Sequence, residues 1–267
     1  MLVAIELRNE LSEPNTIHGH GLRVPHAMDG VPHLTQSPVP PGERFTHGFR
    51  CEDVGTFWYH PRANSPEQLG RGLAGALIVE EPAGSAPAVD RDVTWLLSDV
   101  RVGPDAAIRE DFRTMRDISH AGRLGNAVTI NARVPQGGLA VRAGERLRVR
   151  LINAANGRVL LGPGMRADLI LDITGAPGER FAVTDSFFPR GSYRLTELAY
   201  SDAAPVRPAP LPALAVLPPN PLPEPVLDAA ALRVEIAFGG DNPGDWMLHC
   251  HVPEHHAGGM GDMFRVA

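Results

Sequence analysis

The chain has 267 residues, a net charge of −6 and no basic cluster, which argues against nucleic acid as a partner. No apolar run approaches the length that crosses a bilayer, so we expect no membrane insertion. With 28 Gly and 26 Pro, the composition favours turns and short strands over long helices, and we expect a mainly β fold.

The first residues show no signal peptide, because residues 1–13 contain no basic start followed by an apolar core and a cleavage site. The chain has two cysteines, Cys51 and Cys250. Cys250 stands between two histidines and is better explained as a metal ligand than as half of a disulfide, which leaves Cys51 as a buried thiol. The sequence therefore gives no disulfide and fixes no cellular compartment.

The first candidate site is the run His18-Gly19-His20. Side chains alternate between the faces of a strand, so both imidazoles point the same way. Two surface histidines would show the same spacing, and the pair is weak evidence alone. Asp29 follows, with Gly30 after it; this Asp either starts an ordinary turn or provides a carboxylate that relays protons beside a site.

A second candidate segment covers residues 55–62, Gly-Thr-Phe-Trp-Tyr-His-Pro-Arg. His60 can bind a metal. Arg62 cannot, because a protonated guanidinium has no lone pair to donate and its charge opposes a nearby cation.

Further strands are predicted around residues 93–99 and 140–153, where the alternation from Arg146 to Leu151 indicates a half-buried strand. His120 has no partner at ligand spacing and is interpreted as a structural histidine. From Pro205 to Pro225 nine of 21 residues are proline, which predicts an extended linker.

The strongest signal is Asp245-Trp246-Met247-Leu248-His249-Cys250-His251, continued by His255 and Met260. If Trp246 to His251 is a strand, His249 and His251 share one face and Cys250 takes the other. A thiolate, an imidazole and a weak thioether suit a blue-copper electron-transfer site. The alternatives are a buried Cys beside a zinc site or a polar strand end, but the combined spacing favours copper.

These motifs closely resemble those of the multicopper oxidases, the laccase-like enzymes that oxidise a donor at a type 1 copper and reduce dioxygen at a trinuclear cluster. The resemblance implies an all-β fold of cupredoxin-like Greek-key β-sandwich domains. It divides the chain into a first domain lacking its N-terminal part (1–82), a shortened second domain (83–200), the Pro-rich linker (201–230) and a remnant of a third domain (231–267).

The resemblance also implies the ligands of copper, the expected cofactor. His18 corresponds to a type 2 ligand, His20 and His60 correspond to type 3 ligands, and His249 and His251 would each hold a different copper of the cluster. The type 1 ligands would be Cys250, His255 and the axial Met260. Asp29 and Glu254 resemble acidic residues of the family that relay protons. An ordinary surface glutamate is an equally good interpretation of Glu254.

Two departures from the family pattern bear on activity. Arg62 stands where the family has a His, and no His-Pro-x-His-x-His run, the family's third motif, occurs in the sequence. Of the family's usual ten His and one Cys, the chain retains seven: His18, His20, His60, His249, Cys250, His251 and His255.

Three hypotheses follow. The first is a laccase-like oxidase that takes single electrons from a phenolic or metal-ion donor and reduces dioxygen to water. The second is a copper-binding or electron-transfer remnant without oxygen reduction, and the third is a non-functional fragment. A neighbouring copy that completes the cluster would make the protein an oligomer, and the family resemblance implies a periplasmic or secreted protein.

Overall fold

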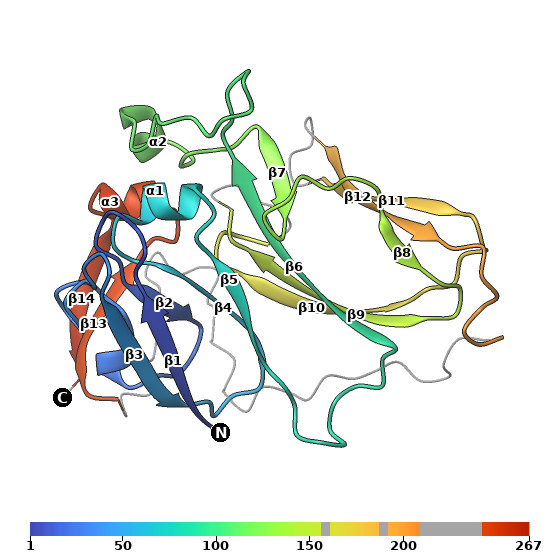
Figure 1. The fold of residues 1–267 in the computed structure, drawn as a ribbon, viewed down its shortest axis with the longest axis horizontal. Coiled ribbons are helices and arrows are strands. Elements are labelled where there is room, and N and C mark those ends of the chain that lie inside the picture. The colour runs from blue at the N-terminus through green and yellow to red at the C-terminus, as the bar shows by residue number, and fades with distance from the viewer. Residues whose placement is uncertain (156–160, 187–191, 209–241, 267) are drawn as a thin grey trace, which may run out of the picture.

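The computed structural model describes residues 1–155, 161–186, 192–208 and 242–266, and strands dominate this part of the chain (Figure 1). The prediction of a mainly β fold is confirmed. Most of the predicted linker, from residue 209 to 230, lies outside the described residues, as does the start of the predicted third-domain remnant, up to residue 241. None of the described helices is long and apolar enough to cross a membrane.

The first domain holds two small antiparallel sheets. One pairs β1 (Leu2–Arg8) with β3 (Arg44–Arg50), and the other has the order β2 (Ile17–His20), β4 (Gly55–Pro61), β5 (Gly75–Val79). Side chains from all five strands line an apolar cavity of about 280 Å³. The two sheets therefore face each other around a loosely filled core. A 3-10 helix, η1 (His26–Met28), and the short helix α1 (Ser65–Gly70) complete this domain.

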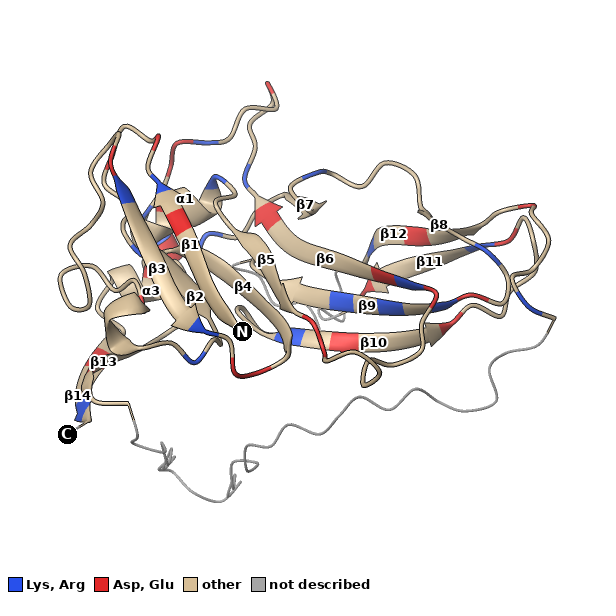
Figure 2. Ribbon diagram, turned by 60° about the horizontal axis from the view of Figure 1, so that its bottom comes forward, with Lys and Arg blue, Asp and Glu red and all other residues tan. Residues whose placement is uncertain are grey.

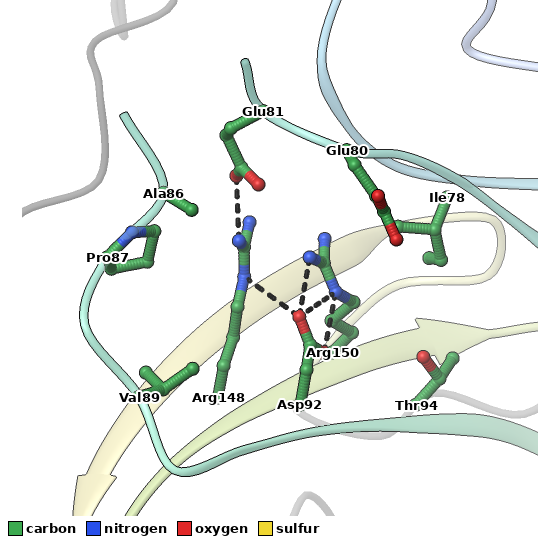
Figure 3. Close-up of a pocket in the computed structure, with 10 residues that line it drawn as sticks. All are labelled: Ile78, Glu80, Glu81, Ala86, Pro87, Val89, Asp92, Thr94, Arg148 and Arg150. Carbon is green, nitrogen blue, oxygen red and sulfur yellow. Dashed lines mark hydrogen bonds and ion pairs between the residues drawn. The ribbon is translucent and has the colours of Figure 1, made fainter. Parts of the chain in front are cut away.

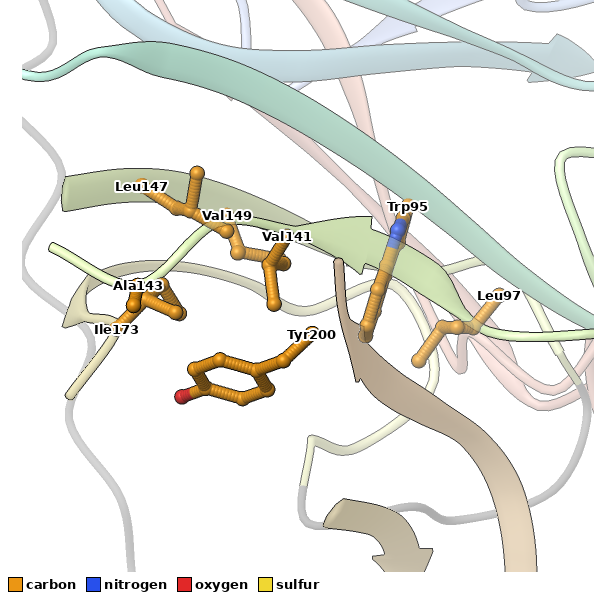
Figure 4. Close-up of a cluster of buried hydrophobic side chains, with 8 residues drawn as sticks. All are labelled: Trp95, Leu97, Val141, Ala143, Leu147, Val149, Ile173 and Tyr200. Atoms are coloured by element: carbon orange, nitrogen blue, oxygen red, sulfur yellow. The ribbon is translucent and has the colours of Figure 1, made fainter. Parts of the chain in front are cut away.

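The middle part has a four-stranded sheet in the order β10 (Arg166–Asp172), β9 (Arg146–Asn153), β6 (Arg91–Val100), β7 (Ala127–Ile130). A three-stranded sheet in the order β11 (Arg180–Asp185), β12 (Tyr193–Tyr200), β8 (Leu139–Val141) packs against it. Between the sheets lies the main apolar core (Figure 4): Trp95, Leu97, Val141, Ala143, Leu147, Val149, Ile173 and Tyr200. Helix α2 (Met115–Ser119) belongs to the long connection between β6 and β7.

The predicted half-exposure of β9 is wrong, because both faces of this strand are covered. Arg146, Arg148 and Arg150 alternate with the aliphatic residues, yet each is no more than 3% exposed. Each guanidinium contacts carboxylates on neighbouring strands, and Figure 2 shows the basic positions of β9 beside acidic positions of β10 and β6. Alternation of charge correctly located the strand but not its burial, since paired arginines can be buried.

Two of these arginines, Arg148 and Arg150, join the sheets of the N-terminal part to those of the middle part. Arg148 Nη1 lies 2.7 Å from Glu81 Oε1, just after β5, and Arg150 Nη1 donates to Thr56 Oγ1 on β4 at 2.9 Å. Thr56 Oγ1 in turn donates to Asp168 on β10 at 2.6 Å. Figure 3 shows both guanidinium groups in a cavity of about 410 Å³ at this junction. This polar network fixes the sheet that carries His18, His20 and His60 against the middle domain.

The C-terminal segment consists of the antiparallel hairpin β13 (Gly244–His249) and β14 (Gly261–Val266), with helix α3 (Pro253–Ala257) between the strands. The segment lies beside the first domain in Figure 1. His26 Nε2 donates to the carbonyl of Asp245 at 2.7 Å, and Asn242 Nδ2 donates to the carbonyl of Val24 at 2.8 Å. The last 25 described residues therefore dock onto residues from the start of the chain.

Candidate metal centre

The pairing register of β2 and β4 positions the first three histidines of the centre. In this antiparallel pair His18 lies opposite His60, and His20 lies opposite Trp58. His18, His20 and His60 therefore project from one face, and one ligand atom from each lies within 4.8 Å of the others. Neutral imidazoles at this spacing can share one metal ion or bind two adjacent ions.

The C-terminal segment adds two more imidazoles. Strand β13 ends at His249, so the predicted strand to His251 is two residues too long. The predicted alternation still holds: the rings of His249 and His251 lie 4.7 Å apart, measured between centroids. The His251 ring lies 4.4 Å from that of His20. The prediction that the two ends of the chain meet at the histidines is confirmed for His251, whereas the ring contacts of His249 are with His251 and His256.

Neighbouring backbone groups orient several of these rings. Nδ1 of His18 lies 2.9 Å from the carbonyl of Asp29, Nδ1 of His60 lies 3.1 Å from that of Pro61, and Nδ1 of His249 lies 2.8 Å from that of Cys250. A ring that donates through Nδ1 presents the lone pair of Nε2 to the centre. Within the described chain His60 Nε2 is buried without a hydrogen-bond partner, as expected for a metal ligand.

Lowered pKa values favour the neutral form of His20, His60, His249 and His251. Burial, with the positive charge of Arg62 and the neighbouring imidazoles, lowers the pKa of His249 to about 3 and that of His251 to about 4. Burial also lowers the pKa values of His20 and His60. Only a neutral imidazole can bind a metal, so these rings are ready to do so at neutral pH.

Cys250 faces the other way, as predicted. Its Sγ lies 3.6 Å from His255 Nδ1 on α3, and His255 Nε2 donates to the carbonyl of His120 at 2.6 Å. That donation leaves the Nδ1 lone pair directed at the sulfur. A thiolate and an imidazole nitrogen at this separation can bind the same ion, because each would need a bond of about 2.0–2.3 Å. His120, predicted to be structural, therefore orients His255.

Met260 is placed beside this pair by its backbone. Its carbonyl accepts from the Cys250 N–H at 3.0 Å, and its N–H donates to the His255 carbonyl at 2.9 Å. The side chain is 56% exposed. Its role as the axial ligand stays a prediction. Cys51 and Cys250 are both free thiols, and Cys51 is half-buried rather than buried as predicted.

Asp29 lies at the edge of the histidine cluster. Its Oδ1 is 3.1 Å from His18 Nδ1, and it is only 8% exposed. Burial opposes its ionisation, but the contact with His18 and the charge of Arg62 outweigh burial and lower its pKa. Gly30 has φ +79°, and a Cβ there would lie 2.0 Å from the carbonyl oxygen of Ile17. Gly30 makes the turn that brings Asp29 to His18. The two interpretations of Asp29, as the start of a turn and as a proton-relaying carboxylate, are therefore compatible.

Glu254 is fully buried on α3, so the surface alternative for this residue is wrong. Burial raises its pKa, and Asp117 from α2 acts in the same direction. A raised pKa means that this carboxyl group keeps its proton to a higher pH than an exposed glutamate does. Its role as a proton donor to the cluster stays a prediction.

Two further residues belong to the centre. The ring of His256 lies 4.7 Å from that of His249, whereas the sequence suggested His256 only as a spare ligand on the Cys250 side. Arg62 is 9% exposed, and its charge influences His249, His251 and His256. Burial lowers the pKa of Arg62 to about 10, with Asp29 opposing the shift, so the guanidinium stays charged at neutral pH.

Comparison with known proteins agrees with this geometry. Two sequence models of the multicopper oxidase family match residues 2–84 and 225–267. Laccase-3 of Botryotinia fuckeliana is 31% identical over 171 residues, covering 58% of this chain and 35% of that protein. Copper resistance protein A of Escherichia coli is 34% identical over 97 residues, covering 36% of this chain and 16% of that protein.

Solved structures give the same result over more of the chain. A multi-copper oxidase from Pseudomonas thermotolerans matches with a TM-score of 0.80 at 29% identity, covering 100% of this chain and 89% of that one. A multi-copper oxidase from Pseudomonas parafulva matches with a TM-score of 0.70 at 35% identity, covering 84% of this chain and 59% of that one.

The fold and the comparisons define a copper protein built of cupredoxin-like β-sandwich domains. The chain belongs to the multicopper oxidase family, as a shortened member. It spans about a third or less of the length of the two curated relatives above. Its buried imidazole nitrogens, and the Sγ and Nδ1 atoms that face each other, fit copper as the cofactor.

Proposed function

We propose that this chain is a laccase-like, copper-dependent oxidoreductase that takes electrons one at a time from a small phenolic or metal-ion donor. One observation supports the proposal: the consecutive residues Cys250 and His251 contact two different groups of candidate ligands. Cys250 lies 3.6 Å from His255, while the ring of His251, the next residue, lies 4.4 Å from that of His20. An electron taken from a donor near Cys250 and His255 would therefore pass directly to the histidine cluster.

Copper bound at these residues would supply one-electron redox chemistry. Cys250 as a thiolate and His255 through Nδ1 would hold the first ion, with Met260 on the following turn as a weak thioether ligand. The sulfur of Cys250 is separated from the rings of His249 and His251 by only a few covalent bonds. An electron accepted on the Cys250 side therefore has a short route into the histidine cluster.

Reduction of dioxygen to water also consumes protons, and two carboxyl groups are suited to supply them. Asp29, 3.1 Å from His18 Nδ1, has a lowered pKa and can accept a proton and pass it on at the cluster edge. Glu254 has a raised pKa and can hold a proton ready for delivery. We propose these two residues as the proton relays of the site.

Ligand number limits what this chain does alone. The seven family ligands it retains include the Cys250 and His255 pair, but the ligands of the third motif are absent from the sequence. We therefore propose donor oxidation as the activity of this chain, and four-electron reduction of dioxygen as the activity of a cluster completed by further ligands. A neighbouring chain is one source of such ligands. A periplasmic or extracellular location is part of the same proposal.

An anaerobic experiment tests donor oxidation without dioxygen. The copper-loaded chain, with its metal content measured, is mixed under argon with a hydroquinone, and the blue absorption is followed. We expect the colour to bleach and to return when ferricyanide is added. A dimethoxy analogue, which has the same ring but no hydroxyl hydrogens to lose, should leave the colour unchanged. A chain that binds copper but is not bleached by the hydroquinone would contradict the proposed function.

A further inference from the structure

The apolar cavity between the β1–β3 sheet and the β2–β4–β5 sheet lies across the second sheet from the histidine cluster. The three histidines of β2 and β4 project from one face of that sheet. Side chains alternate between the faces of a strand, so the residues next to these histidines point the other way. Ile17, Gly19 and Tyr59 are such residues, and all three line the cavity. The cavity is therefore separate from the metal centre.

The size and wall of this cavity suit a small aromatic molecule. Its volume is about 280 Å³, and most of its wall is apolar, with Leu7, Val24, Phe49 and Leu77 among the lining side chains. An apolar cavity of about 150 Å³ is already large enough to hold benzene. The cavity can therefore hold a six-membered ring together with a substituent.

The cavity also has an entrance. Ile5 on β1 and Tyr59 on β4 both line it, yet they are 38% and 40% exposed. Because these two residues belong to different sheets, the opening lies between the sheets. A small molecule can enter from solvent there without separating the strands.

His47 on β3 contributes a buried hydrogen-bond acceptor to the wall. It is 5% exposed, and its Nε2 has no hydrogen-bond partner among the residues that the structure describes. Its Nδ1 lies 3.1 Å from the carbonyl of Met28, which can only accept, so Nδ1 carries the ring proton and Nε2 keeps a lone pair. Burial lowers the pKa of His47, which favours this neutral form.

We propose that this cavity binds one small phenol, whose ring packs among the apolar side chains and whose hydroxyl donates a hydrogen bond to His47 Nε2. A buried acceptor without a partner costs free energy, and the hydroxyl removes that cost. Phe49 and Tyr59 favour an aromatic ring over an aliphatic alcohol, because aromatic rings attract one another in edge-to-face and offset arrangements. The site is distinct from Cys250 and His255, near which donor oxidation is proposed.

4-Fluorophenol is a suitable probe, because its fluorine NMR signal shifts when the molecule leaves water for an apolar cavity. The full-length chain, both metal-free and copper-loaded, is titrated with it under argon. We expect saturable binding of one molecule per chain in the metal-free protein. Absence of saturable binding would overturn the proposal, and so would binding only in the copper-loaded chain, which would place the phenol at the metal centre.

His47→Leu tests the hydrogen bond, with fluorobenzene as the matched ligand that lacks a hydroxyl. The substitution should weaken 4-fluorophenol binding about tenfold, the effect of losing one buried hydrogen bond. Fluorobenzene binding should change by less than about twofold, because that ligand cannot donate to Nε2. Equal weakening of both ligands would show that His47 only supports the wall, and unchanged phenol binding would show that it makes no hydrogen bond. Either result would overturn the proposal.

Leu77→Trp tests the location, because the larger side chain would fill the cavity and should remove the binding of both ligands. Leu169→Trp is the matched control: Leu169 lies on β10, is 42% exposed and does not line the cavity. Binding in Leu169→Trp should equal that of the unmodified chain. Undiminished binding in Leu77→Trp would contradict the proposed location. These measurements use the metal-free chain, so their outcome is independent of donor oxidation.

Discussion

Replacement of Cys250 by serine is expected to abolish the intense blue absorption of the copper-loaded chain. The colour of a blue-copper site comes from a thiolate ligand, and a serine hydroxyl of similar size provides none. The substitution should leave the hairpin intact, because the Cys250 N–H bonds to Met260 through the backbone. Visible absorption per bound copper, measured before and after the change, gives the result.

The chain contains its own control for this experiment. Cys51 is the only other cysteine and is also a free, half-buried thiol. Cys51→Ser should retain the full colour, which excludes a general effect of losing a thiol. Equal colour in Cys250→Ser and in the unmodified chain would show that the sulfur of Cys250 is not a copper ligand.

Oxygen reduction by the chain and by Arg62→His is the subject of a second prediction. We expect the chain to show negligible four-electron reduction of dioxygen, and we expect Arg62→His to increase copper retention without restoring that activity. The change removes a buried charge that opposes cations and adds an imidazole beside His60. The ligands of the absent third motif would still be missing. Oxygen uptake with a phenolic donor, measured with copper content alongside, tests both statements.

Laccase-level turnover by either protein would contradict this expectation and show that other groups complete the cluster. Among histidines outside the motifs, His47 is 5% exposed, with Nδ1 3.1 Å from the Met28 carbonyl and Nε2 buried without a partner in the described part of the chain. His26 is less suited, because its Nε2 already donates to Asp245. His47→Ala would then identify or eliminate the added ligand.

The proximity of side chains within each candidate ligand set was predictable from the sequence where the geometry is local. The two-residue spacing of His249 and His251 places both rings on one side, and a helical turn returns His255 to Cys250. The strand alternation that relates His18 to His20 is equally local. Such patterns need no knowledge of how distant segments pack.

Other features depended on long-range packing and could not be predicted. Full burial of Arg148 requires Glu81 and Asp168, which come from distant parts of the chain. The contact of His256 with His249 follows from the direction in which α3 leaves the hairpin. The sequence predicted that Arg62 would disturb a copper site, but only the packed structure shows its guanidinium buried, with Nε and Nη1 lacking a hydrogen-bond partner in the described chain.

The central claim is that the two ends of the chain build one copper-binding centre. The most direct test is the copper content of the dialysed chain, compared with that of His20→Ala and His251→Ala, whose rings meet at 4.4 Å. His33→Asn is the control, because His33 is exposed and has φ 63°, a conformation that Asn tolerates. We predict that each cluster variant loses copper but keeps its blue colour, while His33→Asn loses neither. Full copper retention in both cluster variants would contradict the claim.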